Sequence, residues 1–195
     1  MNILLHICCG PCTLYPLKIL CQKGLSVTGF FFNPNIHPFT EFYKRVEALK
    51  SVSILKKLPI IWHPTGYGLN EWMEKLEGEF SFGKRCLKCY EIRLEEAAQK
   101  AKELKFDLFS TTLLYSKYQL HEAIKEIGLK KGEKYKIKFY YEDFRLGWKD
   151  GINESIKLGI YRQAYCGCIF SEAERYSNKI NKLNKEFVES NGGVL

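Results

Sequence analysis

The chain has 195 residues, a net charge of +8 and a pI near 9.0, and 46% of its residues are hydrophobic. This is ordinary globular composition, and the length suffices for one hydrophobic core. No apolar run approaches the ~18 residues of a membrane span, and the first residues lack the basic start of a secretory signal. These features exclude an integral membrane protein and predict a cytoplasmic location. The positive charge suits a polyanionic partner such as RNA, and a lysine-rich solvated surface is the alternative.

Short apolar runs alternate with amphipathic segments along the chain. The pattern predicts strands at 2–7, 26–32, 60–62, 106–111 and 136–141, and helices at 13–23, 39–57, 90–104, 117–127 and 171–190. This order predicts an α/β fold, a Rossmann-like parallel sheet with helices on both faces. We expect one domain over residues 1–195, with a cysteine-bearing loop at about 78–89, a C-terminal helix at about 171–190 and a loose glycine-containing tail.

Seven of the eight cysteines fall into three tight clusters. The clusters are Cys8, Cys9 and Cys12; Cys86 and Cys89; and Cys166 and Cys168. In a reducing compartment such clusters indicate metal binding or redox chemistry rather than structural disulfides. Cys21 stands alone at helical spacing from Leu14 and Leu17, so we expect it in the core. His6, inside the first predicted strand, is expected to be a packed, hydrogen-bonded histidine rather than a metal ligand.

Residues 9–12 read Cys-Gly-Pro-Cys, the spacing of a thioredoxin active site. A thiol at the start of a helix has its pKa lowered by the helix dipole, which favours the reactive thiolate. A thioredoxin-like thiol–disulfide oxidoreductase using Cys9 and Cys12 is therefore one interpretation. The presence of Cys8, where thioredoxins usually carry Trp, and of the separate Cys86-x-x-Cys89 pair argues against it.

Cys8 and Cys9 together with Cys86 and Cys89 supply four thiolates, the ligand number of a zinc site or an iron–sulfur cluster. Paired zinc ligands are usually separated by two to four residues, so the adjacent cysteines fit a zinc knuckle poorly. Cys9 with Cys12 would make such a knuckle. A zinc-binding RNA-interaction module therefore remains an alternative to an iron–sulfur protein.

Cys166-Gly167-Cys168 is a pattern of a different kind. Two cysteines separated by one glycine can close a small strained disulfide, and strained disulfides are the easily reduced, catalytic ones. We favour a redox-active pair over two further metal ligands. No phosphate-binding glycine motif is present, which removes the default ATP and dinucleotide hypotheses.

Taken together, these motifs resemble those of the epoxyqueuosine reductases of the QueH type. The matching segments are His6-x-Cys8-Cys9-x-Pro11-Cys12, Gly83-x-Arg85-Cys86-x-x-Cys89-Tyr90-x-x-Arg93-Leu94, Thr111-Thr112-Leu113-Leu114, Asp143-Phe144-Arg145 and Arg162-Gln163-x-Tyr165-Cys166-Gly167-Cys168-x-x-Ser171. The resemblance runs from residue 3 to about residue 171. Lys117 departs from it, because a proline is expected after Ser116.

The resemblance implies the last step of queuosine biosynthesis, in which epoxyqueuosine in a tRNA anticodon loop loses its epoxide oxygen and becomes an alkene. It implies a nucleotide-alpha-hydrolase-like fold, a metal site in the loop after strand one, an external electron donor, and a 4Fe–4S cluster, to which an adjacent mononuclear iron can be added. The implied residues are Cys8, Cys9, Cys86 and Cys89 as cluster ligands, Cys166 and Cys168 as a redox-active disulfide, Cys12 near the extra iron, and Asp143 as a carboxylate or proton donor.

Segment 130–149 interleaves basic and aromatic residues. Its seven basic side chains outnumber three acidic ones, and its aromatic residues are Tyr135, Phe139, Tyr140, Tyr141, Phe144 and Trp148. Such a segment suits phosphate contacts and base stacking, while an edge strand guarded by lysines is the alternative. With the family resemblance, we expect tRNA contact near this segment.

Overall fold

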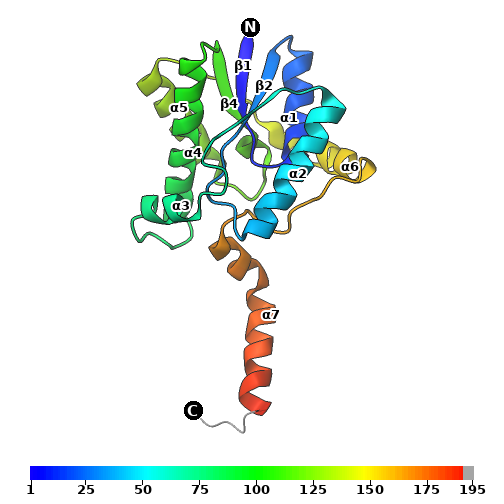
Figure 1. Ribbon diagram of the computed structural model, residues 1–195, viewed down its shortest axis with the longest axis vertical. Coiled ribbons are helices and arrows are strands. Elements are labelled where there is room, and N and C mark those ends of the chain that lie inside the picture. The colour runs from blue at the N-terminus through cyan, green and yellow to red at the C-terminus, as the bar shows by residue number, and fades with distance from the viewer. Residues whose placement is uncertain (191–195) are drawn as a thin grey trace.

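The computed structural model describes residues 1–190, so the expected glycine-containing tail lies outside the described residues. A parallel sheet is sandwiched between helices, and one long helix stands out from this body toward the C-terminus (Figure 1). The strands are β1 (Asn2–His6), β2 (Ser26–Phe31), β3 (Ile60–Trp62), β4 (Leu108–Thr111) and β5 (Lys138–Phe139). The sheet order is β3-β2-β1-β4-β5, and every neighbouring pair is parallel.

The central strand β1 is almost wholly apolar and buried, which explains its place in the middle of the sheet. β2 and β3 continue the sheet on one side of β1, and β4 and β5 continue it on the other. The strand order therefore reverses at β1, and the loop that follows β1 lies where folds of this type bind ligands. The predicted α/β fold class is confirmed.

Helices cover both faces of the sheet. The α-helices are α1 (Gly10–Gln22), α2 (Phe39–Lys56), α3 (Leu69–Lys75), α4 (Lys84–Glu103), α5 (His121–Tyr135), α6 (Trp148–Lys157) and α7 (Ile169–Ser190). Two short 3-10 helices, η1 (Thr112–Tyr115) and η2 (Phe144–Gly147), lie between them. α1 packs with α2 and α6 on one face, and α4 packs with α5 on the other (Figure 1).

Several sequence expectations about these elements are wrong, among them the bounds of the helix expected at 117–127, which runs from His121 to Tyr135. Residues 78–89 are not a loop throughout, because α4 begins at Lys84 and carries both cysteines of that segment. The strand expected at 136–141 is only two residues long, since α5 runs to Tyr135 and Lys136 turns the chain in a left-handed conformation. Cys21 is exposed, because burial along α1 is concentrated in its first turns and fades toward its end.

α7 begins against the body and then extends away from it (Figure 1). Phe170, near its start, packs against Trp72 and Phe80, and Glu174 pairs with Arg85. No side chain of α7 is buried. Among residues 1–190, no helix combines the length and the hydropathy needed to cross a membrane.

Candidate metal and redox site

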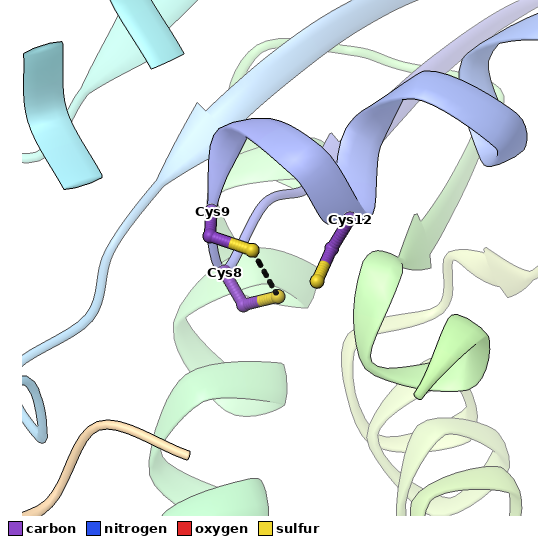
Figure 2. Close-up of side chains that lie close together, drawn as sticks. All are labelled: Cys8, Cys9 and Cys12. Atoms are coloured by element: carbon purple, nitrogen blue, oxygen red, sulfur yellow. Dashed lines mark hydrogen bonds between the residues drawn. The ribbon is translucent and has the colours of Figure 1, made fainter. Parts of the chain in front are cut away.

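Three cysteines gather where β1 passes into α1. Cys8 follows the strand, Cys9 occupies the N-cap position of α1, and Cys12 lies in its first turn (Figure 2). Their sulfur atoms all lie within 4.8 Å of one another, and the Cys8 and Cys9 sulfurs are 3.8 Å apart. We call this set the N-terminal thiol group. It is a compact set of soft donors of the kind that binds zinc or iron.

The backbone reaches this arrangement because the helix starts with Gly10, which has no side chain, and Pro11, whose φ is already helical. A side chain at Gly10 would bring its Cβ to 2.8 Å from the carbonyl oxygen of Ala48, so only glycine permits this approach of α1 to α2. Pro11 lies in the first turn, where its missing N–H costs no helix hydrogen bond. The helix therefore starts at Gly10, three residues before the predicted start, and includes Cys12.

Polar side chains from distant segments surround the thiol group. The Thr112 hydroxyl donates to the Cys8 sulfur at 3.2 Å and accepts from the Cys8 N–H at 3.0 Å. The amide nitrogen Nε2 of Gln163 lies 2.9 Å from the Cys9 sulfur and 3.5 Å from the Cys12 sulfur. These contacts orient the sulfurs, and N–H donors to sulfur are one way a protein tunes a metal centre.

Next to the thiol group, His6 is buried with both ring nitrogens engaged. Nδ1 lies 2.8 Å from the Thr111 hydroxyl, and Nε2 lies 3.2 Å from the carbonyl oxygen of Phe32. Burial, aided by the charge of Arg93, lowers the pKa of His6 to about 3. The expectation of a packed, hydrogen-bonded histidine is confirmed.

The three thiols lie close enough to shift one another's pKa. Hydrogen bonds from Cys12 and Cys9 lower the pKa of Cys8 well below its usual value. Burial raises the pKa of Cys9, and hydrogen bonding to Cys8 raises that of Cys12.

Cys86 and Cys89 occupy the first turns of α4, outside the close three-sulfur set. Cys89 is buried, and burial raises its pKa to about 12. The guanidinium of Arg93 links it to the N-terminal thiol group: Nη1 lies 3.9 Å from the Cys89 sulfur, and the same charge lowers the pKa of Cys8. Arg93 is fixed in turn by Asn33, whose Oδ1 accepts from Nη2 at 2.6 Å.

Cys166 and Cys168 lie on the segment between α6 and α7, and both are free thiols in this structure. The Cys166 sulfur accepts from Nε2 of Gln119 at 3.2 Å, whereas the Cys168 sulfur is 3.4 Å from the N–H of Ser171. The disulfide expected between them is not formed, and the two sulfurs have separate partners.

One cavity of about 650 Å³ is lined by cysteines from two of the three clusters. Cys8 and Cys12 of the N-terminal thiol group line it together with Cys166. Its other linings include the aromatic and cationic side chains Tyr115, Tyr118, Trp148, Arg45, Arg93, Arg162 and Arg175. The cavity is therefore a cationic, aromatic-walled space with thiols from both ends of the chain.

Asp143 is not part of this cavity. Its carboxylate caps η2 by accepting from the N–H of Arg145 at 3.0 Å and pairs with the guanidinium of the same residue at 2.6 Å. The hydrogen bond from Arg145 lowers the pKa of Asp143, which keeps it ionised at neutral pH. Its role as a proton donor stays a prediction.

Segment 130–149 is less available for RNA than its composition suggests. Phe139 and Phe144 are buried in the core, so stacking on bases by these two rings is ruled out. Lys131 and Lys134 both pair with Glu95 on α4. Trp148 alone of this segment reaches the cavity wall.

Sequence reasoning did not assign several residues that complete the site. They are Arg45, Arg93, Thr112, Gln119, Gln163 and Arg175. Arg93, Thr112 and Gln163 stand inside the motifs that carry the family resemblance, so a signal existed for them. Arg45, Gln119 and Arg175 stand outside those motifs.

Comparison with known proteins assigns the chain to a family. The family profile described as "Epoxyqueuosine reductase QueH" matches residues 3–174. A protein of that name from Thermotoga maritima is 36% identical over 180 residues, covering 89% of this chain and 92% of the relative. Those from Dehalococcoides mccartyi and Streptococcus pyogenes are 33% and 32% identical, covering 90% and 87% of this chain and 94% and 70% of the relatives. The chain is thus an oxidoreductase that belongs to the epoxyqueuosine reductase QueH family.

Proposed function

We propose that this protein reduces epoxyqueuosine in a tRNA anticodon loop to queuosine, in the cytoplasm, with a thiolate-held iron–sulfur centre and a redox-active cysteine pair. The observation that carries the proposal is the shared cavity, in which Cys8, Cys12 and Cys166 line one space. Family membership supports the reaction. The cavity supports a metal centre at the N-terminal thiol group with a redox-active pair, Cys166 and Cys168, beside it.

The cysteines fit the proposed metal centre by donor chemistry. A 4Fe–4S cluster takes four thiolates, and the proposed ligands are Cys8, Cys9, Cys86 and Cys89. An assembly of thiolates is negatively charged, and the buried guanidinium of Arg93 lies against Cys89 and acts on Cys8. Cys12 remains as a fifth thiolate for an adjacent iron. When bound, such a centre supplies low-potential single electrons and, at an open iron position, a Lewis acid for the epoxide oxygen.

The cavity walls suit a base displaced from a tRNA loop. Proteins that read single-stranded loops stack unpaired bases on aromatic rings or guanidinium planes. Tyr118 is 81% exposed, and its ring packs edge-on against Trp148, which leaves a wide aromatic surface for a base. Arg162 and Arg175 are exposed beside the cavity and are placed for contact with phosphate groups.

The Cys166–Cys168 pair matches the electron count of the reaction. Converting an epoxide to an alkene and water consumes two electrons and two protons. Oxidising two thiols to one disulfide releases two electrons and two protons, so one closure of the pair balances one turnover. An external electron donor must then reopen the disulfide. Cys166 faces the cavity, which supports its assignment as the thiol nearer the reacting centre.

The test is an oxygen-free preparation incubated with tRNA that carries epoxyqueuosine and a chemical reductant. We expect iron and acid-labile sulfide in the protein, and nucleosides from the tRNA that have lost one oxygen atom. A protein that holds only zinc and leaves the nucleoside unchanged would support the zinc-binding RNA module instead, which the compact N-terminal thiol group favours as the second candidate. A metal-free protein that reduces protein disulfides would support the thiol–disulfide exchanger.

A further inference from the structure

The turn that carries Cys166 and Cys168 is fixed by hydrogen bonds that its main-chain carbonyls accept from other segments. Nη2 of Arg45 donates to the carbonyl of Tyr165 at 3.0 Å, and Nη1 donates to that of Cys166 at 2.8 Å. The next carbonyl, that of Gly167, accepts from the N–H of His37 at 2.8 Å. Three consecutive carbonyls of the turn thus accept hydrogen bonds, two from Arg45 on α2 and one from His37, which lies just before that helix.

Arg45 is itself fixed from behind. It is 1% exposed, and its Nε donates to Glu41 Oε1 at 2.7 Å. The other oxygen of Glu41 accepts from the hydroxyl of Tyr161 at 2.5 Å. All three guanidinium nitrogens therefore have partners, as a buried charge requires. Because Tyr161 stands shortly before the turn, the contacts close a ring: Tyr161 to Glu41 to Arg45 and back to the turn.

The turn has little freedom to move within this ring. Gly167 has φ +140°, in the region that favours glycine, and a Cβ there would lie 3.1 Å from Nη1 of Arg45. The hydroxyl of Tyr165 also donates to the carbonyl of His37 at 2.6 Å. In this conformation the Cys166 sulfur faces Gln119 and the cavity, while Cys168 is buried beside Ser171.

We propose that Arg45, fixed by Glu41 and Tyr161, is a positioning residue that stabilises the open dithiol form of the turn relative to its disulfide. The inference rests on the redox role of the pair proposed above. Closing the disulfide brings the two sulfurs to about 2.05 Å, so each sulfur must leave its present partner, Gln119 or Ser171. We infer that so short a ring closes by moving the backbone of the turn away from the carbonyl positions that Arg45 binds. As the S–S bond forms, the two thiols give up two protons and two electrons, which the epoxide accepts as it becomes an alkene and water. An added dithiol reverses the closure by forming its own disulfide. A stabilised dithiol form makes a disulfide more oxidising and easier to reduce again.

The experiment measures the disulfide equilibrium of the pair directly. Wild-type protein, Arg45→Met and the control Lys50→Met are equilibrated without oxygen in buffers of graded reduced-to-oxidised dithiothreitol ratio. After alkylation, mass spectrometry gives the disulfide fraction of the peptide that contains Cys166 and Cys168. Lys50 is exposed on the same helix and pairs with Glu47, so its loss removes a cation without touching the turn.

We expect Arg45→Met to favour the disulfide about tenfold, which shifts the midpoint potential about 30 mV more negative. Lys50→Met should match wild type. Arg45→Lys should fall between them, since an ammonium lacks the planar fork that binds two adjacent carbonyls. A purely structural role for Arg45 would not produce this ordered shift in potential.

The outcomes separate this inference from the proposed function. A folded Arg45→Met protein with the wild-type midpoint would overturn the inference alone. If Arg45→Met does not fold, Tyr161→Phe, which removes one hydrogen bond to Glu41, must shift the midpoint in the same direction by a smaller amount, and no shift would overturn the inference. A wild-type protein with no reversible Cys166–Cys168 disulfide would overturn the redox assignment of the pair itself.

Discussion

The N-terminal thiol group and the Cys166–Cys168 turn both line one cavity, yet they are held in place by different means. Cys8, Cys9 and Cys12 are positioned by regular structure, at the end of a central strand and the start of the helix that follows it. The turn has no regular structure of its own and is positioned by hydrogen bonds to its carbonyls. A site anchored in a strand and a helix suits a permanent metal centre. A turn held by a few hydrogen bonds changes conformation only when those bonds break, which is what the proposed opening and closing of its disulfide would require.

The largest effect is expected when a proposed ligand of the metal centre is removed. Cys89→Ala removes a proposed ligand from α4, so we expect iron and acid-labile sulfide to fall to background and epoxide reduction to disappear. Cys21→Ala is the matched control, because Cys21 is an exposed cysteine on α1. Metal analysis and nucleoside analysis of oxygen-free preparations measure both. Full iron content and activity in Cys89→Ala would contradict the ligand assignment.

The next effect isolates the turn. Cys166→Ser should retain iron and sulfide, because no proposed ligand is changed, but it cannot form the disulfide that we propose closes each catalytic cycle. We expect multiple-turnover rates to fall about 100-fold, equivalent to about 2.7 kcal/mol of activation free energy. Rate measurements with excess tRNA test this. A variant that turns over at the wild-type rate would show that the pair has no redox role.

The centre of the fold was predictable because strands β1 to β4 are short, mainly apolar runs and the long helices have amphipathic spacing, whereas α3 and α6 were not predicted. The start of α4 was missed because Gly83 at its N-cap offers no side chain to bind the first N–H groups, so the usual start signal is absent. The start of α1 was missed because a Gly-Pro pair usually indicates a turn, whereas here it forms the first helical turn.

The cysteines of the site could also be predicted from the sequence, since closely spaced cysteines indicate metal binding or redox chemistry. Their partners could not. Gln163 lies more than 150 residues from the sulfurs it binds, and Arg45 is 121 residues from Cys166. Spacing along the chain carries no information on such contacts, because the packing of the whole fold decides them.

A smaller effect is expected at Gln163, which stands just before the Cys166–Cys168 turn and contacts the N-terminal thiol group. Gln163→Leu removes the N–H donor to the Cys9 and Cys12 sulfurs while leaving every thiol in place. Losing such an outer contact costs about tenfold in metal affinity or activity. Because hydrogen bonds to sulfur raise the potential of a cluster by easing its reduction, the midpoint potential should also become more negative. Potentiometric titration measures this shift, and an unchanged midpoint would rule out the tuning role.

The smallest expected effect concerns stability near the turn. Burial lowers the pKa of His37 to about 4, so the folded state binds fewer protons than the unfolded state between about pH 4 and the usual value of 6.5. Stability from this group is therefore present above pH 6.5 and decreases as the pH falls toward 4. His37→Phe should reduce that decrease while retaining contact with Trp72. Urea unfolding at about pH 7 and about pH 5 measures it, and an equal loss in both proteins would refute the assignment.

The measurement that tests the central claim most directly is a single-turnover incubation of reduced, iron-loaded protein with tRNA carrying epoxyqueuosine, in the absence of oxygen. We predict that the tRNA nucleoside loses one oxygen atom, and that the Cys166–Cys168 peptide recovered from the same tube is oxidised in step with product. Product without oxidation of the pair would contradict the assignment of the two cysteine regions to separate tasks. No product from iron-loaded protein would contradict the proposed function.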